Sequence, residues 1–240
     1  MADFYEQSAL GTGAMLGTTL VQGKGNIGGH RHVFVGLQGG GKNGLVFPPV
    51  GGVVVNPFRG RARAFAGDLC EYTINGAVYI LKTFEVATNA AAGSTSVALV
   101  RDGYHHVPFA GDILASAPTS VDTPVVGKVV QSVTEGDGVW NVVFAEPIEG
   151  AMSAGSFFVE AKAPGADTTV RVQNPNSFLP CDYDFGYVAG SDPDDINGAR
   201  YLITPCLANE DTKLIVSKMT KLPECYLSMN KSLVKGWFNL

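Results

Sequence analysis

The chain has 240 residues, of which 45% are hydrophobic and 16% are charged, and its formal net charge at pH 7 is −5. This hydrophobic share excludes wholesale disorder, and a chain of this length buries enough surface to fold without a metal or a disulfide staple. No stretch approaches the roughly 18 uncharged apolar residues of a membrane span. The first residues lack the basic start and apolar core of a secretory signal.

The leading part of the chain is basic and rich in glycine. No Asp or Glu occurs between Gln7 and Gly67, whereas six Lys and Arg residues do, and 15 of the 30 glycines fall within the first 60 residues. Its apolar residues come in three short bursts, at 33–35, 45–47 and 53–55. Because glycine loses the most backbone entropy on ordering, such a segment usually becomes ordered by lying against something else. We predict that residues 1–66 form an extended arm, packed on its own body or, in the interpretation we prefer, docked on another subunit.

From Asp68 onward the pattern changes to that of strands. Runs rich in β-branched and aromatic residues lie at 77–87, 94–100, 112–115, 125–134, 139–144 and 156–160. Turn signals separate these runs, and their near-regular spacing predicts a small antiparallel barrel or sandwich. The fold is therefore expected to be mainly β. We place the arm at 1–66, the barrel or sandwich domain at 67–163, and a β-rich C-terminal region at 164–240 that packs on the body or on a partner.

Two glycine-rich segments resemble nucleotide-binding loops. The segment at 36–43 approaches a P-loop, but Asn43 follows Lys42 where a Ser or Thr must hold magnesium. The segment at 23–28 has the spacing of a dinucleotide fingerprint. In neither case does the following sequence favour the helix that would meet the phosphates. We therefore predict no cofactor and no catalytic residue.

No metal site is expected either. The four histidines are His30, His32, His105 and His106, and they have no partner ligands nearby in sequence, so we interpret them as polar loop residues. A calcium loop that begins with the acidic turn at 192–198 would have Ile196 and Ile203 at two positions that need oxygen ligands. The four cysteines are Cys70, Cys181, Cys206 and Cys225. Their spacing fits neither a metal site nor a required disulfide framework, and we predict reduced, buried thiols.

A short basic cluster lies near the end of the arm. It consists of Arg59, Arg61 and Arg63. Arginine can contact nucleic-acid phosphates, but no signature of a nucleic-acid-binding module accompanies the cluster, and arginine pairs equally well with carboxylates. We predict contact with a protein partner and disfavour nucleic acid. The residues expected to add apolar or strand-edge contact are Val53, Val54 and Val55.

Several phrases of the body and tail resemble head-associated structural proteins of tailed bacteriophages that infect Bacteroides, crAss-like phages included. The phrases lie at 66–72, 78–86, 109–114, 155–161, 178–185 and 230–238. Such proteins are labelled head fiber or auxiliary capsid proteins. The resemblance implies a non-enzymatic virion component of the phage head, made in the host cytoplasm. Its expected partners are the major capsid protein or other virion subunits, and we expect a homo-oligomer with no membrane association.

Three other hypotheses stay open. A fibre that binds a host receptor or glycan would be favoured by exposed aromatic residues at loop tips, such as Tyr104 and Trp140. A connector or ring protein next to the portal is a variant of the virion hypothesis, and copy number per particle separates it from a shell decoration. A cytosolic enzyme would depend on Lys42 in the near-P-loop.

Overall fold

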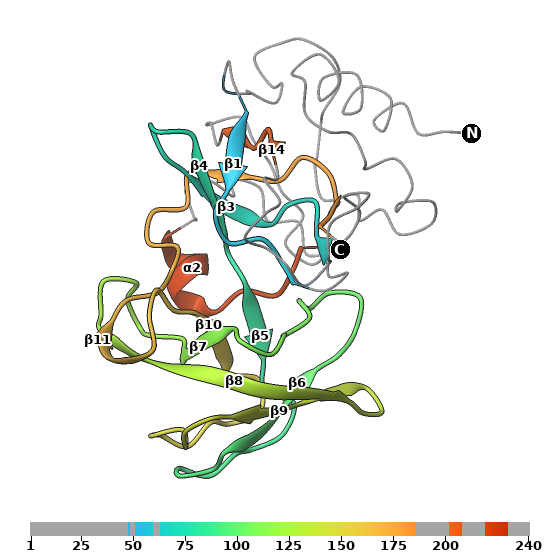
Figure 1. Ribbon diagram of the computed structural model, residues 1–240, viewed down its shortest axis with the longest axis vertical. Helices are drawn as coiled ribbons and strands as arrows, with labels where there is room; N and C mark the ends of the chain where they lie inside the picture. Colours follow the sequence, from blue (N-terminus) through green and yellow to red (C-terminus); the bar gives the residue numbers. More distant parts are fainter. Residues whose placement is uncertain (1–47, 49–50, 60–62, 186–201, 208–218, 230–240) are drawn as a thin grey trace. The chain divides into compact units, whose positions relative to one another are not determined.

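The protein is described from a computed structural model (Figure 1). The residues that it describes are 48, 51–59, 63–185, 202–207 and 219–229. Their fold is mainly β, with strands β1 to β15 and the short helix α2, so the predicted fold class is confirmed. Most of the predicted arm lies outside the described residues.

Contacts within the chain group its residues into two units. Unit 1 comprises Met1–Ile80, Asn174–Met219 and Asn230–Leu240, and unit 2 comprises Leu81–Gln173 and Thr220–Met229. The boundaries between these units differ from the boundaries that the sequence indicates in two places. Residues 51–59 and 63–66, which the sequence boundaries join to the arm, belong to unit 1, and so do residues 67–80, which they join to the barrel domain.

Unit 1 is built on a six-stranded sheet. Its strands are β1 (Gly52–Val54), β3 (Leu69–Tyr72), β4 (Ala77–Ile80), β12 (Ser177–Phe178), β14 (Leu202–Ile203) and β15 (Cys206–Leu207). They run in the order β14-β1-β4-β3-β12-β15, and only β1 and β4 are parallel neighbours. A separate antiparallel pair joins β2 (Arg63–Ala64) to β13 (Tyr183–Asp184). Val54, Val78 and Ile80 are buried on one face, as the alternation of a half-buried strand requires.

Unit 2 is a closed antiparallel barrel. Its strands are β5 (Thr83–Glu85), β6 (Ser96–Val100), β7 (Ile113–Ser116), β8 (Val125–Glu135), β9 (Val139–Phe144) and β10 (Phe157–Glu160), with β11 (Gly165–Thr168) added beside β8. The hydrogen-bonded order is β5-β10-β7-β8-β9-β6. An antiparallel bridge between Val86 and Leu99 joins the two ends, and the Ala87 N–H donates to the Ala98 carbonyl at 2.8 Å. The path of pairings therefore returns to its first strand.

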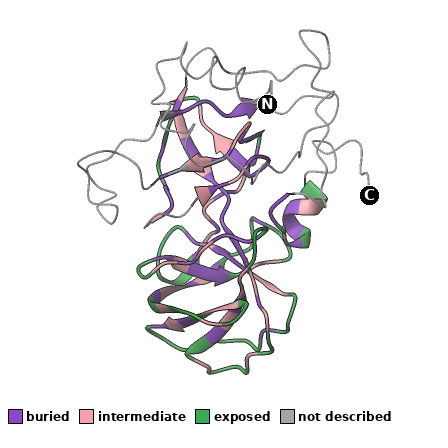
Figure 2. Cartoon of the chain, turned by 90° about the vertical axis from the view of Figure 1, so that its right-hand side faces the viewer, coloured by how far each residue is buried: buried purple, intermediate pink, exposed green. Residues whose placement is uncertain are grey.

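The barrel is filled by large apolar side chains. The buried cluster is Phe84, Val86, Val97, Leu99, Leu114, Val130, Val142, Phe144, Ile148, Met152 and Phe158. The rings of Phe144 and Phe158 lie 5.4 Å apart between centroids. Exposed residues gather in the connecting loops and on the outward positions of the strands (Figure 2). The core is therefore a packed interior made by the inward residues of all six strands.

The segment at 220–229 packs on the barrel although it is distant in sequence. The Thr83 hydroxyl donates to the Lys221 carbonyl at 2.7 Å, and the Lys221 N–H donates to the Tyr104 carbonyl at 3.3 Å. Helix α2 (Glu224–Met229) follows, and the buried Tyr226 hydroxyl donates to the Val172 carbonyl at 2.5 Å. Among the described residues, no helix has the length and apolar character needed to cross a membrane.

One turn recurs four times in the described residues, always with Ala-Gly before Asp or Ser. It lies at 65–68, 91–94, 109–112 and 153–156. The last N–H donates to the first carbonyl at 3.0–3.1 Å, and the glycine has φ between 83° and 88°. The glycine N–H and the next carbonyl both bond to a single residue opposite, which is Leu179, Ile148, Val130 or Val86 respectively. This arrangement is a β-bulge that needs glycine in its left-handed position.

Candidate protein-docking surface

The three valines predicted to contact a partner do not share one environment. Val53 and Val54 lie in β1, and Val55 follows directly. Val54 is 5% exposed and belongs to the core, whereas Val53 is 36% and Val55 48% exposed. Because successive side chains of a strand point to opposite faces, Val53 and Val55 share the outer face. Only these two can offer apolar surface to a partner without unfolding.

Both edges of β1 are already hydrogen-bonded. It pairs with β14 in antiparallel register and with β4 in parallel register. The Val53 N–H donates to the Gly76 carbonyl at 2.7 Å, and the Val55 N–H donates to the Val78 carbonyl at 2.9 Å. Contact through Val53 and Val55 therefore has to use side chains, because β1 is an inner strand of its sheet.

A further exposed apolar residue lies in the turn between β3 and β4, whose Gly76 carbonyl accepts the Val53 N–H. Ile74 is fully exposed, at 100%. The turn is fixed on both sides of it, since the Thr73 N–H donates to the Ala77 carbonyl and the Gly76 N–H donates to the Thr73 carbonyl, each at 2.9 Å. Gly76 supplies the positive φ of 75° that the turn needs. We call Val53, Val55 and Ile74 the apolar strip.

Gly52 sets how closely β1 approaches the turn. A Cβ at this position would meet a Val78 methyl at 2.4 Å and the Gly76 carbonyl oxygen at 2.9 Å. Both distances are shorter than side-chain carbons tolerate, so only glycine lets the two backbones lie together here. The strand β1 and the turn at 73–76, which carry the apolar strip, are therefore packed tightly against each other. Sequence reasoning missed Ile74, because a single apolar residue between Thr and Asn reads as an ordinary polar turn.

The basic cluster is divided by the structure. Arg59 follows β1 and Arg63 lies in β2, where its Cα is paired with that of Asp184. Both arginines are half-buried and interact within the chain. Arg61 lies outside the described residues. The near-P-loop with Lys42 and the acidic turn at 192–198 also lie there.

Two cysteines of unit 1, Cys70 and Cys181, interact with the phenol of Tyr183. All four cysteines of the chain are free thiols, and Cys181 is less buried than the other three. Burial raises the pKa of the Cys181 thiol to about 12, although a hydrogen bond with Tyr183 opposes the rise. Burial also raises the pKa of Cys70 and of Tyr183 well above their ordinary values. Thiols with raised pKa are protonated at neutral pH and are poor nucleophiles, so these residues serve the core.

The two histidines of unit 2 are loop residues, as expected, but they are buried. His105 is 5% exposed, and its ring lies between two carboxylates: Nδ1 is 2.7 Å from an Asp102 oxygen and Nε2 is 2.7 Å from a Glu85 oxygen. Nδ1 of His106 accepts the Thr83 N–H at 3.1 Å. These nitrogens hold the loop at 101–106 against β5. In the described part of the chain, no group of three His, Cys, Asp or Glu residues is arranged to hold a metal ion.

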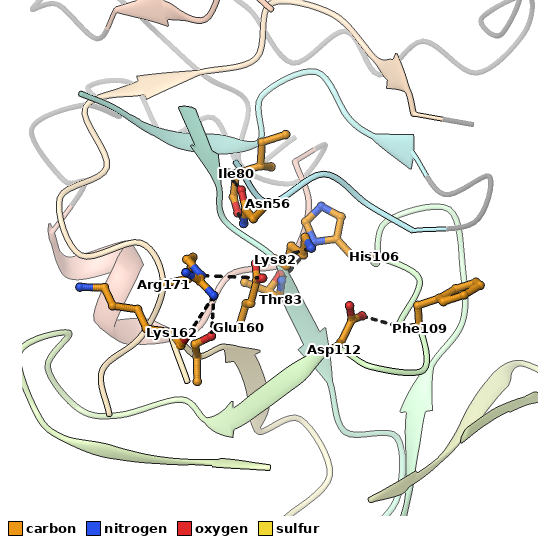
Figure 3. Close-up of polar contacts among 11 residues, drawn as sticks. Asn56, Ile80, Lys82, Thr83, His106, Phe109, Asp112, Glu160, Lys162 and Arg171 are labelled. Atoms are coloured by element: carbon orange, nitrogen blue, oxygen red, sulfur yellow. Dashed lines mark hydrogen bonds and ion pairs between the residues drawn. The ribbon is translucent and has the colours of Figure 1, made fainter. Parts of the chain in front are cut away.

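A buried ion cluster lies beside β10 in the same unit (Figure 3). Lys82 is 4% exposed, and its Nζ lies 3.6 Å from a Glu160 oxygen. Arg171 Nε lies 3.9 Å from the other Glu160 oxygen, and its Nη2 donates to the carbonyls of Ala161 and Lys162 at 3.4 and 3.0 Å. Removing one partner of such a buried pair leaves an uncompensated charge. The cluster therefore ties the strand β10 to the segment that carries Arg171.

Of the two aromatic residues considered as loop-tip residues, Tyr104 lies in a loop and Trp140 lies in a strand. Tyr104 is 42% exposed in the loop at 101–106. Trp140 lies within β9 and packs partly buried against the barrel core, with the Arg101 guanidinium 5.1 Å from its ring centroid. Trp140 is thus part of the barrel wall.

No protein-family model matches the chain, and comparisons with curated proteins and with solved structures find no significant match.

Proposed function

We propose that the protein is a non-enzymatic structural component of a tailed-phage virion, made in the host cytoplasm and attached to the head. It docks on the major capsid protein or on other virion subunits. The observation that supports this proposal best is the apolar strip, because it contains two of the residues predicted to bind a partner and lies where the acid-free arm joins the folded chain.

Exposure of single apolar side chains is common on soluble proteins. The strip differs in its arrangement, because Val53 and Val55 share one face of β1 and Ile74 lies in the turn whose Gly76 bonds to Val53. Clustered exposed apolar surface is typical of protein-protein contacts. Arg59, Arg61 and Arg63 are assigned the polar rim of this contact, facing carboxylates of the partner.

The barrel has features of a stable structural component. Its six-stranded path closes at Val86 and Leu99, so no edge is left to pair with a wrong partner along that path. The turns at 91–94, 109–112 and 153–156 are held by paired backbone hydrogen bonds. A closed body of this kind supports a structural role.

The test is to measure the protein in purified phage particles by quantitative mass spectrometry, comparing wild type with a Val53→Asp/Val55→Asp variant. We expect the wild type in particles and the variant depleted from them although it is produced in soluble, folded form. Absence of the wild type from particles would overturn the proposal. Copy number then separates roles: many copies indicate a shell decoration, and a single ring indicates a portal-proximal connector.

One observation favours the alternative of a host-binding fibre. Tyr104 offers an exposed aromatic ring on a loop that His105 holds in place, and such rings stack on sugar faces. A Tyr104→Ala phage that adsorbs to host cells as well as the wild type, together with a negative glycan array, would remove this alternative.

A further inference from the structure

We propose that Asn75 is a site of spontaneous deamidation, at which the main-chain nitrogen of Gly76 attacks the side-chain amide and leaves aspartate or isoaspartate. The reaction does not depend on the proposed virion role, because it uses only groups of one turn and water. Asn-Gly pairs occur at 43–44, 75–76 and 197–198, and only the second lies in the described part of the chain.

The chemistry balances without any oxidant, reductant or bound cofactor. The Gly76 nitrogen forms a bond to Cγ of Asn75, the Cγ–Nδ2 bond breaks, and ammonia leaves with the proton that the Gly76 nitrogen gives up. Water then opens the resulting succinimide. Opening at the former side-chain carbonyl gives aspartate, and opening at the main-chain carbonyl gives isoaspartate. Because glycine carries no Cβ, nothing on the attacking residue blocks its approach to Cγ.

The tip of the turn at 73–76 is not held by packing. Asn75 is exposed, and Ile74 before it is exposed at 100%. A Cβ placed on Gly76 would meet nothing within 4 Å. The tip can therefore open without removing a buried side chain from the core, which makes local opening inexpensive.

Hydrogen bonds within the turn set how often the attack occurs. The Gly76 N–H donates to the Thr73 carbonyl at 2.9 Å, so the attacking nitrogen is held until this bond opens. The Thr73 hydroxyl closes the same turn, because it accepts the Ala77 N–H at 3.1 Å and donates to the Ala77 carbonyl at 3.3 Å. The reaction therefore proceeds from the opened turn, and its rate scales with the fraction of time that the turn is open.

The two products have different consequences for β1. The Gly76 carbonyl accepts the Val53 N–H at 2.7 Å, and a Cβ on Gly52 would lie 2.9 Å from the same oxygen. Isoaspartate lengthens the main chain by one carbon directly before Gly76, which displaces this carbonyl from Val53. Aspartate keeps the length of the main chain and leaves the bond to Val53 in place. Only isoaspartate is therefore expected to disturb the strand that carries the exposed valines.

The first experiment incubates the folded full chain in mildly alkaline buffer and follows position 75 by peptide mapping and mass spectrometry. We expect aspartate and isoaspartate to accumulate there, more slowly than in a denatured sample of the same chain. Asn75→Gln is the matched control, because glutamine keeps the amide but has to close a larger ring, and it should stay unchanged. A folded chain whose Asn75 remains intact while the denatured chain reacts would overturn the inference.

The second experiment tests control by the turn. Thr73→Val removes the hydroxyl that bonds to Ala77 and should raise the rate at Asn75 by about fivefold, the effect of losing one hydrogen bond. Thr73→Ser keeps the hydroxyl and should react like the wild type. Equal rates for Thr73→Val and the wild type would show that the turn does not gate the reaction.

The third experiment compares the products by hydrogen exchange of the Val53 amide. The isoaspartate fraction of an incubated sample should exchange this amide faster by about fivefold or more, because its bond to Gly76 is lost. An Asn75→Asp variant represents the other product and should exchange like the wild type. Equal exchange in all three samples would overturn the assignment of isoaspartate as the product that disturbs β1.

Discussion

The sheet of unit 1 and the barrel of unit 2 start from the same turn and bring their end strands together differently. Phe-Ala-Gly-Asp occurs at 65–68 and again at 109–112, and in both the Asp carboxylate accepts the Phe N–H, at 2.7 and 2.8 Å. In unit 2 the two ends of the strand path meet at the bridge between Val86 and Leu99, whereas in unit 1 the two end strands, β14 and β15, follow each other in the chain with only residues 204–205 between them. The local motif fixes how a strand begins, whereas the end strands of each sheet are joined by a different means, a backbone bridge in unit 2 and a two-residue connection in unit 1.

This difference assigns different tasks to the two units. The barrel uses its backbone donors and acceptors on itself and directs its large apolar side chains inward. Unit 1 leaves Val53, Val55 and Ile74 exposed. We therefore expect unit 2 to contribute a stable core and unit 1 to contribute the docking surface.

The largest effect is expected from the barrel core. Phe158 is 1% exposed and packs on Phe144, so Phe158→Ala should lower the free energy of unfolding by about 3–5 kcal/mol. Phe157→Ala is the matched control, because Phe157 is the preceding residue of β10 and is only half-buried. Chemical denaturation should show a clearly smaller loss for the control. Equal losses would mean that the barrel interior is not the main source of stability in unit 2.

Alkaline pH should act on unit 1 through its buried acids. The pKa of Cys181 is about 12 in the folded protein, and burial also raises the pKa of Cys70 and Tyr183. Below the unfolded thiol pKa of about 8.5, both states keep their protons and this stabilisation is complete. As pH rises further, the unfolded state releases protons that the folded state retains, so stability falls by up to about 1.4 kcal/mol per pH unit for each group.

Denaturation series between pH 7 and 10.5 would measure this slope. Cys181→Ala removes one of the titrating groups, so its stability should fall less steeply than that of the wild type in the same range. Parallel slopes for the two proteins would contradict the assignment of Cys181 as a thiol that stays protonated in the folded protein.

Because both units contain the same bulge, replacing its glycine should lower the free energy of unfolding by the same amount in each. Gly67 and Gly111 have φ of 86° and 88°, so Gly67→Ala and Gly111→Ala should each cost about 1–2 kcal/mol, the penalty of a left-handed backbone for a residue with a Cβ. Gly103→Ala is the control, because a Cβ there meets nothing within 4 Å and the backbone does not need glycine. A cost at one bulge only would show that the turns are alike in sequence but not in energetics.

The sequence predicted most barrel strands because their patterns are local. The runs at 139–144 and 125–134 correspond to β9 and β8 almost residue by residue. The run at 77–87 was expected as one strand, but it divides into β4 and β5 at Leu81 and Lys82, both of which are buried, and its halves belong to different units. Closure between Val86 and Leu99 depends on pairing that no local pattern encodes.

The candidate site was predicted in part. A burst of valines indicates apolar contact, but it does not show that Val54 faces the core while Val53 and Val55 face outward. That distinction depends on which face of the sheet is covered. No feature of the sequence indicates Ile74 as a contact residue, because its exposure depends on the position of a turn beside β1.

The smallest effect on stability is expected where the proposed effect on docking is greatest. Ile74 is fully exposed, so Ile74→Thr removes no packing within the chain and should change the free energy of unfolding by no more than about 0.5 kcal/mol. Thermal unfolding at low protein concentration, where copies are separate, measures this directly. A loss well above 1 kcal/mol would mean that another part of the same chain covers Ile74. The strip would then belong to the interior of unit 1, and the contrast between a docking unit and a rigid barrel would have to be abandoned.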